Sequence, residues 1–220
     1  IGPGKGAITV ALAAHVSAIT AIEIDRDLHE PLRMHPKLQD GLTLIEADAL
    51  TVDFARLGSN LRIVGNLPYN ISTPLLLHVF DSIECVYDMH FMLQKEVVLR
   101  MGAEPGSKAY GRLSILCQHF CEVEHVFDVP AHCFSPVPKV ESAIVRLQPK
   151  PIEQRQCVSR DALEAVTKQG FSMRRKTLAN NFKGMFSADE LSAMGIDPTK
   201  RPETLPLSQW HVLANAFSAQ

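Results

Sequence analysis

Apolar runs and polar breaks alternate along the first two thirds of the chain. The runs predict strands at 18–24, 42–46, 61–64, 86–93, 123–129 and 142–147. Segments with helical spacing lie between them, at 8–16, 25–34, 73–81 and 112–120. Strands that alternate with helices indicate an α/β fold, with a parallel sheet that helices cover on both faces.

The pattern changes at 148–154, a polar connection that carries two prolines. Beyond it the β-rich runs stop, and short helices are predicted at 161–170, 175–183, 188–194 and 208–217. Ser187 and Ser208 stand at two of the expected starts, where a hydroxyl can cap the helix. We therefore predict an α/β domain over residues 1–149 and a small all-helical domain over 150–220.

The composition is that of an ordinary globular protein, with 46% hydrophobic and 21% charged residues in 220. No apolar run approaches the roughly 18 to 20 residues that span a bilayer, and no signal peptide is visible. The five cysteines lack the spacing of a metal site, so we expect buried free thiols and no metal. These features favour a cytoplasmic protein that does not enter a membrane.

Charge is unevenly distributed along the chain. Residues 1–145 carry 11 Lys and Arg against 17 Asp and Glu, whereas residues 146–183 carry 9 against 3. The basic band includes Arg174, Arg175 and Lys176. A solvated helix face would explain such a band, and so would a surface that binds a phosphate backbone.

The chain begins at Ile1, inside a glycine-rich run with no strand before it. We expect the native domain to continue upstream of this point. The glycines at Gly2, Gly4 and Gly6 precede a predicted helix, where they allow a tight turn and close approach of a ligand to free N–H groups.

Two acidic residues follow the next predicted strands. Glu23 ends the first of them and can accept both hydroxyls of a ribose, as in many nucleotide-binding α/β proteins. Asp48 follows the second, where it can accept from an adenine amine or cap a helix. Because open α/β sheets bind ligands at the carboxyl ends of their strands, these positions predict a nucleoside-bearing ligand. A nicotinamide dehydrogenase would share the glycines and Glu23.

The sequence VGNLPYN distinguishes between these ligands. It places Asn66, Leu67, Pro68 and Tyr69 at the end of a strand. The Asn66 side chain and the Leu67 backbone offer two carbonyl oxygens, Pro68 restricts the turn, and Tyr69 offers a ring for stacking. Two acceptors holding both N–H bonds of an aromatic amine would free its nitrogen lone pair. The motif therefore predicts a clamp for a planar base that carries an amine.

The chain resembles the S-adenosylmethionine-dependent ribosomal RNA adenine dimethyltransferase family, closest to its bacterial small-subunit branch. The resemblance rests on IGPGKGAIT, IEIDRDL, EADAL, VGNLPYNISTPLL, GSKAYGRLSI, FSPVPKVESAIVRL and FSMRRKTLANN. It implies a Rossmann-like methyltransferase sheet with a small helical domain. It also implies an enzyme that uses S-adenosyl-L-methionine to dimethylate two adjacent adenosines of small-subunit ribosomal RNA and assists maturation of the immature subunit. We expect this enzyme to be a monomer.

The resemblance also assigns roles to residues. Gly2, Gly4, Glu23, Asp48 and Asn66 would bind the cofactor. Asn66, Leu67, Pro68 and Tyr69 would hold the target adenine. Phe134, Arg174, Arg175 and Lys176 would contact RNA. Family members carry an upstream segment that covers the cofactor and is missing from this chain.

Other functions remain open at this point. A large-subunit RNA dimethyltransferase would use the same motifs, although FSPVPKVESAIVRL and the C-terminal helices favour the small-subunit branch. A mainly non-catalytic assembly factor would bind the subunit and methylate only incidentally. A nicotinamide oxidoreductase would leave Asn66 to Tyr69 unexplained.

Overall fold

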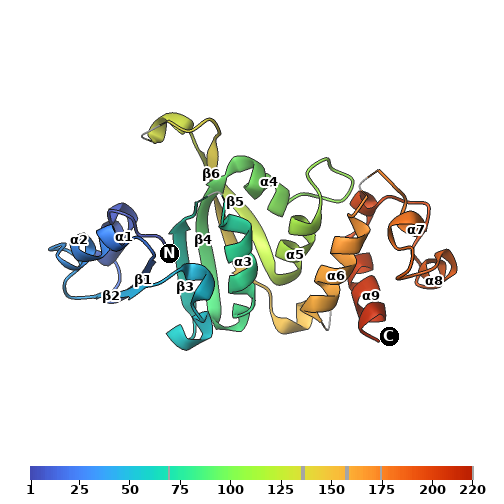
Figure 1. The fold of residues 1–220 in the computed structure, drawn as a ribbon, viewed down its shortest axis with the longest axis horizontal. Coiled ribbons are helices and arrows are strands. Elements are labelled where there is room, and N and C mark those ends of the chain that lie inside the picture. Colours follow the sequence, from blue (N-terminus) through green and yellow to red (C-terminus); the bar gives the residue numbers. More distant parts are fainter. Residues whose placement is uncertain (69, 135–136, 157–158, 174, 220) are drawn as a thin grey trace. The chain divides into compact units, whose positions relative to one another are not determined.

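The computed structural model describes residues 1–68, 70–134, 137–156, 159–173 and 175–219 (Figure 1). The strands are β1 (Ile19–Glu23), β2 (Leu42–Glu46), β3 (Leu61–Asn66), β4 (Val86–Gln94), β5 (Cys121–Val129) and β6 (Ser142–Pro149). The helices are α1 (Ala7–Ala13), α2 (His29–Arg33), α3 (Ser72–Phe80), α4 (Lys95–Met101), α5 (Arg112–Phe120), α6 (Arg160–Gly170), α7 (Leu178–Asn181), α8 (Ala188–Ala193) and α9 (Leu207–Ser218).

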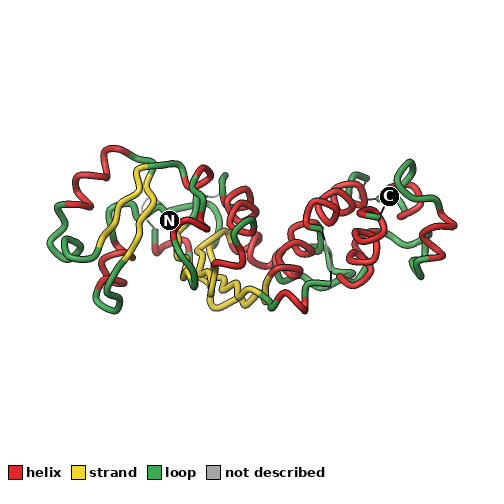
Figure 2. Tube along the Cα trace, turned by 90° about the horizontal axis from the view of Figure 1, so that it is seen from below, coloured by secondary structure: helices red, strands yellow, loops and turns green. Residues whose placement is uncertain are grey.

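The strands form two hydrogen-bonded sheets. One pairs β1 with β2, and the other has the order β3-β4-β6-β5. The strands are drawn in yellow in Figure 2. The pairs β1–β2 and β3–β4 are parallel, with Glu23 opposite Glu46 and Asn66 opposite Met92. Every strand expected from the sequence is present, and the predicted α/β class is confirmed, but the strands are mixed in direction and do not form the parallel sheet that was expected.

The chain divides into two compact units. Unit 1 comprises residues 1–94 and 126–146, and unit 2 comprises 95–125 and 147–220. Helices α4 and α5 therefore group with the C-terminal helices, whereas the sequence suggested a division after residue 149. The division at 149 stays a prediction about which part folds independently.

The core of unit 1 fixes the position of β3 and β4. Leu75, Leu76 and Val79 of α3 are fully buried, as are Met89 and Phe91 of β4. On β3, Arg62 donates from Nε and from one terminal nitrogen to the two carboxylate oxygens of Asp88, at 2.9 and 2.8 Å. Asp88 has no exposed surface, and the hydrogen bonds from Arg62 lower its pKa. This paired contact holds the register that places Asn66 at the strand end.

Unit 2 is held together by helix packing around one tryptophan. Helices α6 and α9 pack along each other, and Trp210 of α9 is fully buried. Its ring stacks on Phe171 with centroids 5.3 Å apart. A Cβ on Gly170 would lie 2.5 Å from the Trp210 ring, so only glycine allows this close approach.

Several local expectations are corrected by the structure. Helix α4 was not predicted, because its short amphipathic run follows a strand without a break. Ser208 lies inside α9, since Pro206 occupies the capping position, whereas Ser187 does cap α8. The helix expected over 175–183 begins only after Thr177. Among the described residues, no helix is long and apolar enough to cross a bilayer.

Candidate active site at the carboxyl ends of β1, β2 and β3

The Glu23 carboxylate is the most firmly held group at the end of β1. Glu23 is only 6% exposed, so its carboxylate depends on hydrogen bonds from the protein. Its Oε2 accepts from the Gly4 N–H at 3.1 Å, and its Oε1 accepts from the Asp25 N–H at 3.0 Å. Each oxygen keeps further acceptor capacity, so the carboxylate is oriented but not saturated.

The glycine loop lies between β1 and β3 (Figure 1). The Gly2 N–H donates to the carbonyl of Ile22 at 2.9 Å, and the Ile1 nitrogen donates to the carbonyl of Val64 at 2.7 Å. Gly2 and Gly4 have φ values of +59° and +57°, a conformation that disfavours other residues. A Cβ at either position would meet no atom within 4 Å, so open space adjoins the loop.

Asp48 lies just beyond β2 and caps a short 3-10 turn. Its Oδ1 accepts from the Leu50 N–H at 2.9 Å, which is the capping role that the sequence left open. The preceding Ala47 N–H donates to the carbonyl of Glu23 at 3.2 Å. The segment that carries Asp48 is thus bonded directly to the end of β1.

Asn66 ends β3 with an exposed side chain, whereas Leu67 beside it is buried. The Leu67 N–H donates to the carbonyl of Met92 on β4 at 3.2 Å, which anchors the turn. Pro68 is exposed, and its carbonyl accepts from the Ile71 N–H at 3.2 Å as α3 begins. Tyr69 lies outside the described residues. Asn66 is therefore an exposed residue at the strand end and not part of the core.

Gly65 explains how the loop reaches β3. A Cβ there would lie 2.7 Å from the Leu67 side chain and 3.1 Å from the carbonyl oxygen of Ile1. A larger residue would push apart the chain start and the turn that follows Asn66. This role of Gly65 was not expected from the sequence, because a single glycine in a strand has many explanations.

The residues expected to contact RNA fall in different parts of the chain. Phe134 belongs to unit 1 and is half-buried after a short 3-10 turn. Arg175 and Lys176 belong to unit 2 and are exposed, whereas Arg174 lies outside the described residues. All four assignments stay predictions.

A buried amide shapes the loop that carries Arg175 and Lys176. Asn181 has no exposed surface, and its Oδ1 accepts from the Met173 N–H at 2.9 Å. Its amide nitrogen donates to the carbonyls of Met173 at 3.3 Å and Lys176 at 3.2 Å. One side chain thus holds both ends of the short segment. Asn181 stands in the motif FSMRRKTLANN, but nothing in the sequence indicates this role.

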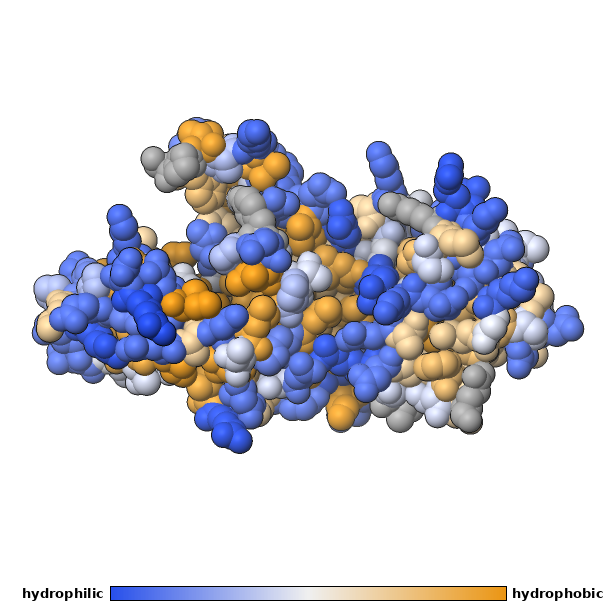
Figure 3. Space-filling view, in the orientation of Figure 1, coloured by the Kyte–Doolittle hydropathy of each residue, from blue (hydrophilic) through white to orange (hydrophobic). Residues whose placement is uncertain are grey.

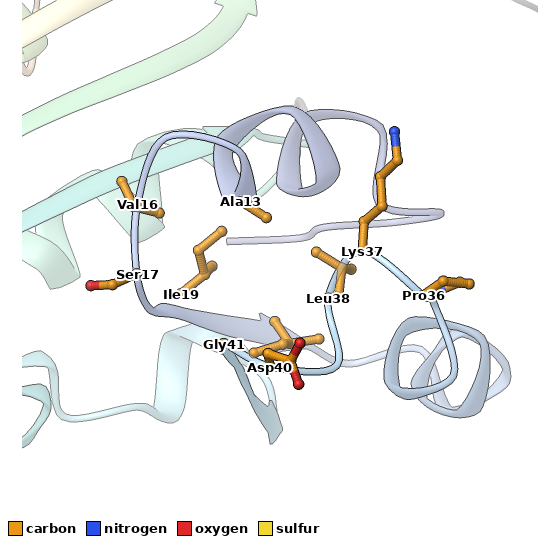
Figure 4. Close-up of a pocket in the computed structure, with 10 residues that line it drawn as sticks. Ala13, Val16, Ser17, Ile19, Pro36, Lys37, Leu38, Asp40 and Gly41 are labelled. Carbon is orange, nitrogen blue, oxygen red and sulfur yellow. The ribbon is translucent and has the colours of Figure 1, made fainter.

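The pocket drawn in Figure 4 is a different place in unit 1. It has a volume of about 330 Å³ and lies where β1 and β2 begin, lined by Ile19, Lys37 and Leu42 among others. Glu23 and Glu46 end the same two strands, so this pocket is at the opposite edge from the predicted cofactor site. We assign it no part in that site.

Comparison with known proteins decides the family. The model of the ribosomal RNA adenine dimethylase family matches residues 1–219. The chain belongs to this family. A protein of Legionella pneumophila named ribosomal RNA small subunit methyltransferase A is 53% identical over 218 residues, which are 99% of this chain and 85% of that protein. A Shewanella baltica protein of the same name is 50% identical, over 98% of this chain and 81% of its own length.

A solved structure agrees with these relatives. The dimethyladenosine transferase from Plasmodium falciparum has 27% sequence identity and a TM-score of 0.85, over 99% of this chain and 88% of that one. Members of the ribosomal RNA adenine dimethylase family are methyltransferases that use S-adenosyl-L-methionine, and this chain is one of them.

The described residues fit this cofactor. A buried carboxylate with spare acceptor capacity suits a ribose diol, and Glu23 provides it next to an open glycine loop. The second oxygen of Asp48 is available for an adenine amine in addition to the cap that Oδ1 makes. Among the described residues, no group of three His, Cys, Asp or Glu could hold a metal.

The cysteines follow the expectation only in part. Cys117 and Cys121 are buried, and burial raises the pKa of both thiols. Cys133 is exposed and Cys85 is half-buried, which corrects the expectation that all the thiols are buried. Cys157 lies outside the described residues.

Proposed function

We propose that this chain transfers methyl groups from S-adenosyl-L-methionine to N6 of two adjacent adenosines in a hairpin loop near the 3′ end of small-subunit ribosomal RNA, giving N6,N6-dimethyladenosine. The observation that carries the proposal is the exposed Asn66 carboxamide at the end of β3, in a chain half identical to relatives named small-subunit methyltransferases.

The chain's own residues act mainly by orientation. The bound cofactor supplies a methyl group that its sulfonium has already activated. Glu23 and the loop of Gly2 and Gly4 hold the ribose and methionine parts, and Asp48 holds the adenine. An enzyme that fixes both reactants in line removes much of the entropic barrier to such a transfer.

The NLPY turn acts on the other reactant. The adenine N6 lone pair is delocalised into the ring and is a weak nucleophile. The side-chain oxygen of Asn66 and the backbone oxygen of Leu67 accept from the two N–H bonds, which favours a pyramidal nitrogen. Tyr69, with Phe134 as a second face, stacks on the base. The N6 proton becomes acidic as the methyl group transfers, so the proposal needs no dedicated base.

The substrate is an adenosine in a loop of the bound RNA. A base in a loop is largely unstacked, so it enters the clamp at less cost than a base in a duplex. Arg174, Arg175 and Lys176 bind the RNA backbone through charge. We propose that the enzyme works as a cytoplasmic monomer on the immature small subunit.

Mass spectrometry of nucleosides tests this function. Small and large ribosomal subunits that lack the modification are incubated separately with the protein and isotope-labelled cofactor. We expect labelled N6,N6-dimethyladenosine from the small subunits only. Label in the large-subunit RNA would favour a large-subunit dimethyltransferase instead.

The assembly-factor alternative needs a second measurement. An Asn66→Ala variant is tested for methyl transfer and for rescue of small-subunit assembly. If transfer is lost and rescue is complete, methylation is incidental to assembly. If both are lost while subunit binding is kept, the enzymatic function is the essential one.

A further inference from the structure

A buried histidine contacts the backbone of Glu23, the residue that carries the predicted ribose-binding carboxylate. His29, the first residue of α2, is 7% exposed. Its Nε2 lies 3.1 Å from the backbone oxygen of Glu23, and its Nδ1 lies 3.1 Å from a carboxylate oxygen of Glu46. Arg33 contacts the other oxygen of Glu46. The contacts link α2, β2 and the end of β1.

The chemistry of these contacts fixes what the ring does. A backbone carbonyl can only accept, so Nε2 must carry a proton and donate to Glu23. The Glu46 carboxylate lies against the other ring nitrogen, and Nδ1 can donate to it only when both ring nitrogens carry a proton. The Glu23 carbonyl therefore has two donors, His29 Nε2 and the Ala47 N–H. Its peptide plane is held from two directions.

The orientation of that peptide plane determines where the Glu23 carboxylate lies. The chain turns immediately after Glu23, and two residues later the Asp25 N–H returns to bond Glu23 Oε1 at 3.0 Å. Asp25 then accepts from the Asp27 N–H at 3.0 Å, which starts the turn that leads into His29. Residues 23–29 thus form a closed loop whose two ends are joined by the ring of His29.

We propose that His29 is a positioning residue for the cofactor: its bond to the Glu23 carbonyl fixes the turn that presents the Glu23 carboxylate. The inference rests on the proposed role of Glu23 in binding the ribose. His29 itself is too deeply buried to be offered as a ligand contact.

Two substitutions of His29 distinguish the effect of its hydrogen bond to Glu23 from the effect of losing the packed ring. In His29→Gln the amide nitrogen extends to about the place of Nε2 and can still donate to Glu23. In His29→Asn the shorter amide reaches about the place of Nδ1 and cannot. Both remove a buried ring, so a purely structural role would affect both alike.

The readouts are S-adenosylhomocysteine affinity by calorimetry and hydrogen exchange of the Asp25 amide. We expect His29→Asn to weaken binding about tenfold, the effect of removing one hydrogen bond, and to speed exchange at Asp25. His29→Gln should stay within about threefold of the parent affinity because it keeps that bond.

His78 provides a matched control in the same unit. Its Nε2 lies 2.8 Å from the backbone oxygen of Val52, and its Nδ1 lies 3.7 Å from an Asp81 oxygen. His78→Asn should lower the melting temperature without changing cofactor affinity. Equal losses of affinity in His29→Asn, His29→Gln and His78→Asn would overturn the positioning role.

A Glu23→Gln variant distinguishes the positioning role of His29 from the proposed cofactor-binding role of Glu23. If Glu23→Gln binds S-adenosylhomocysteine as tightly as the parent, the proposed cofactor site is wrong. If Glu23→Gln binds weakly and His29→Asn binds normally, only the positioning role of His29 is overturned.

Discussion

The Gly4 N–H donates to Glu23 Oε2 at 3.1 Å, which joins the glycine loop to the end of β1. The sequence shows the glycine loop and Glu23 as separate features, and this hydrogen bond shows that they are in contact. It also makes the left-handed conformation of Gly4 important, because that conformation points the N–H at the carboxylate.

Substitution of this glycine should separate affinity from stability. Gly4→Ala places a side chain at φ +57°, at a cost of roughly 1 to 2 kcal/mol in the free energy of unfolding. Its methyl group enters the open space beside Glu23, so calorimetry should show markedly weaker S-adenosylhomocysteine binding. Gly184→Ala, at φ +90° and also without neighbours within 4 Å, is the control that should lose stability alone. Equal S-adenosylhomocysteine affinities in Gly4→Ala and Gly184→Ala would show that the glycine loop is not part of the cofactor site.

The basic loop should determine the salt dependence of RNA binding. Reversing the charge of Arg175 and Lys176 should weaken RNA binding across sequences. The slope of log affinity against log salt should fall by about 0.7 for each phosphate of a single strand that the variant no longer neutralises. The charge-matched variant Lys37→Glu with Arg56→Glu should leave the slope much closer to that of the parent. Equal slopes in the parent and the loop variant would contradict RNA binding at this loop.

Asn181 should be as important to that loop as its charges. Asn181→Ala leaves the Met173 N–H and two carbonyls without their partner, so we expect a loss of about 2 to 4 kcal/mol in the free energy of unfolding. Amide exchange at Met173 should become faster. The neighbouring Asn180→Ala, an exposed site, should change neither quantity much. A stable Asn181→Ala protein with unchanged exchange would show that the amide does not hold the loop.

Two buried histidines should make unit 2 sensitive to acid. His119 Nδ1 lies 3.0 Å from His211 Nε2, and burial lowers the pKa of each ring from 6.5 to about 4. Nearby positive groups, Lys150 for both rings and Arg155 for His119, act in the same direction. Between these pH values the unfolded chain binds more protons than the folded one. The free energy of unfolding should therefore fall as the pH drops from about 6.5 towards 4.

Denaturant titrations at several pH values check this expectation. His211→Asn removes one titrating ring and should give a shallower pH dependence than the parent. His15→Gln, at an exposed position, should give the same pH dependence as the parent. If the His211→Asn profile also matches the parent, the buried pair does not control acid stability.

The sequence predicted much of the fold, and it placed Glu23, Asp48 and Asn66 at or just beyond strand ends, for a clear physical reason. Strand ends, a glycine loop and NLPY are local patterns, and parallel strands bring their carboxyl ends to one edge. His29 and Asn181 were missed because their partners are backbone atoms of other segments, which leave no mark on spacing. In Figure 3, hydrophilic residues predominate over α2 and β2, and nothing in that surface pattern reveals the buried ring of His29.

Two helix starts were predicted wrongly because residues outside the local pattern determine where these helices begin. Ser208 has the chemistry of a cap, but Pro206 precedes it in an extended conformation and the helix begins at Leu207. The segment before Thr177 has helical residues, but its backbone bonds to the side chain of Asn181 instead. In both cases an interaction outside the expected helix determined where it begins.

The most direct test of the central claim is the single-turnover rate of methyl transfer by Asn66→Ala, measured beside its affinity for S-adenosylhomocysteine. The account predicts that the rate falls by about a hundredfold or more, as it does when an enzyme is deprived of a carboxamide that stabilises a reacting group. Cofactor affinity should fall by a smaller factor, because Asn66 is one of five residues expected to bind the cofactor and the other four are unchanged. A rate within about threefold of the parent would show that the Asn66 carboxamide does not hold the reacting amine.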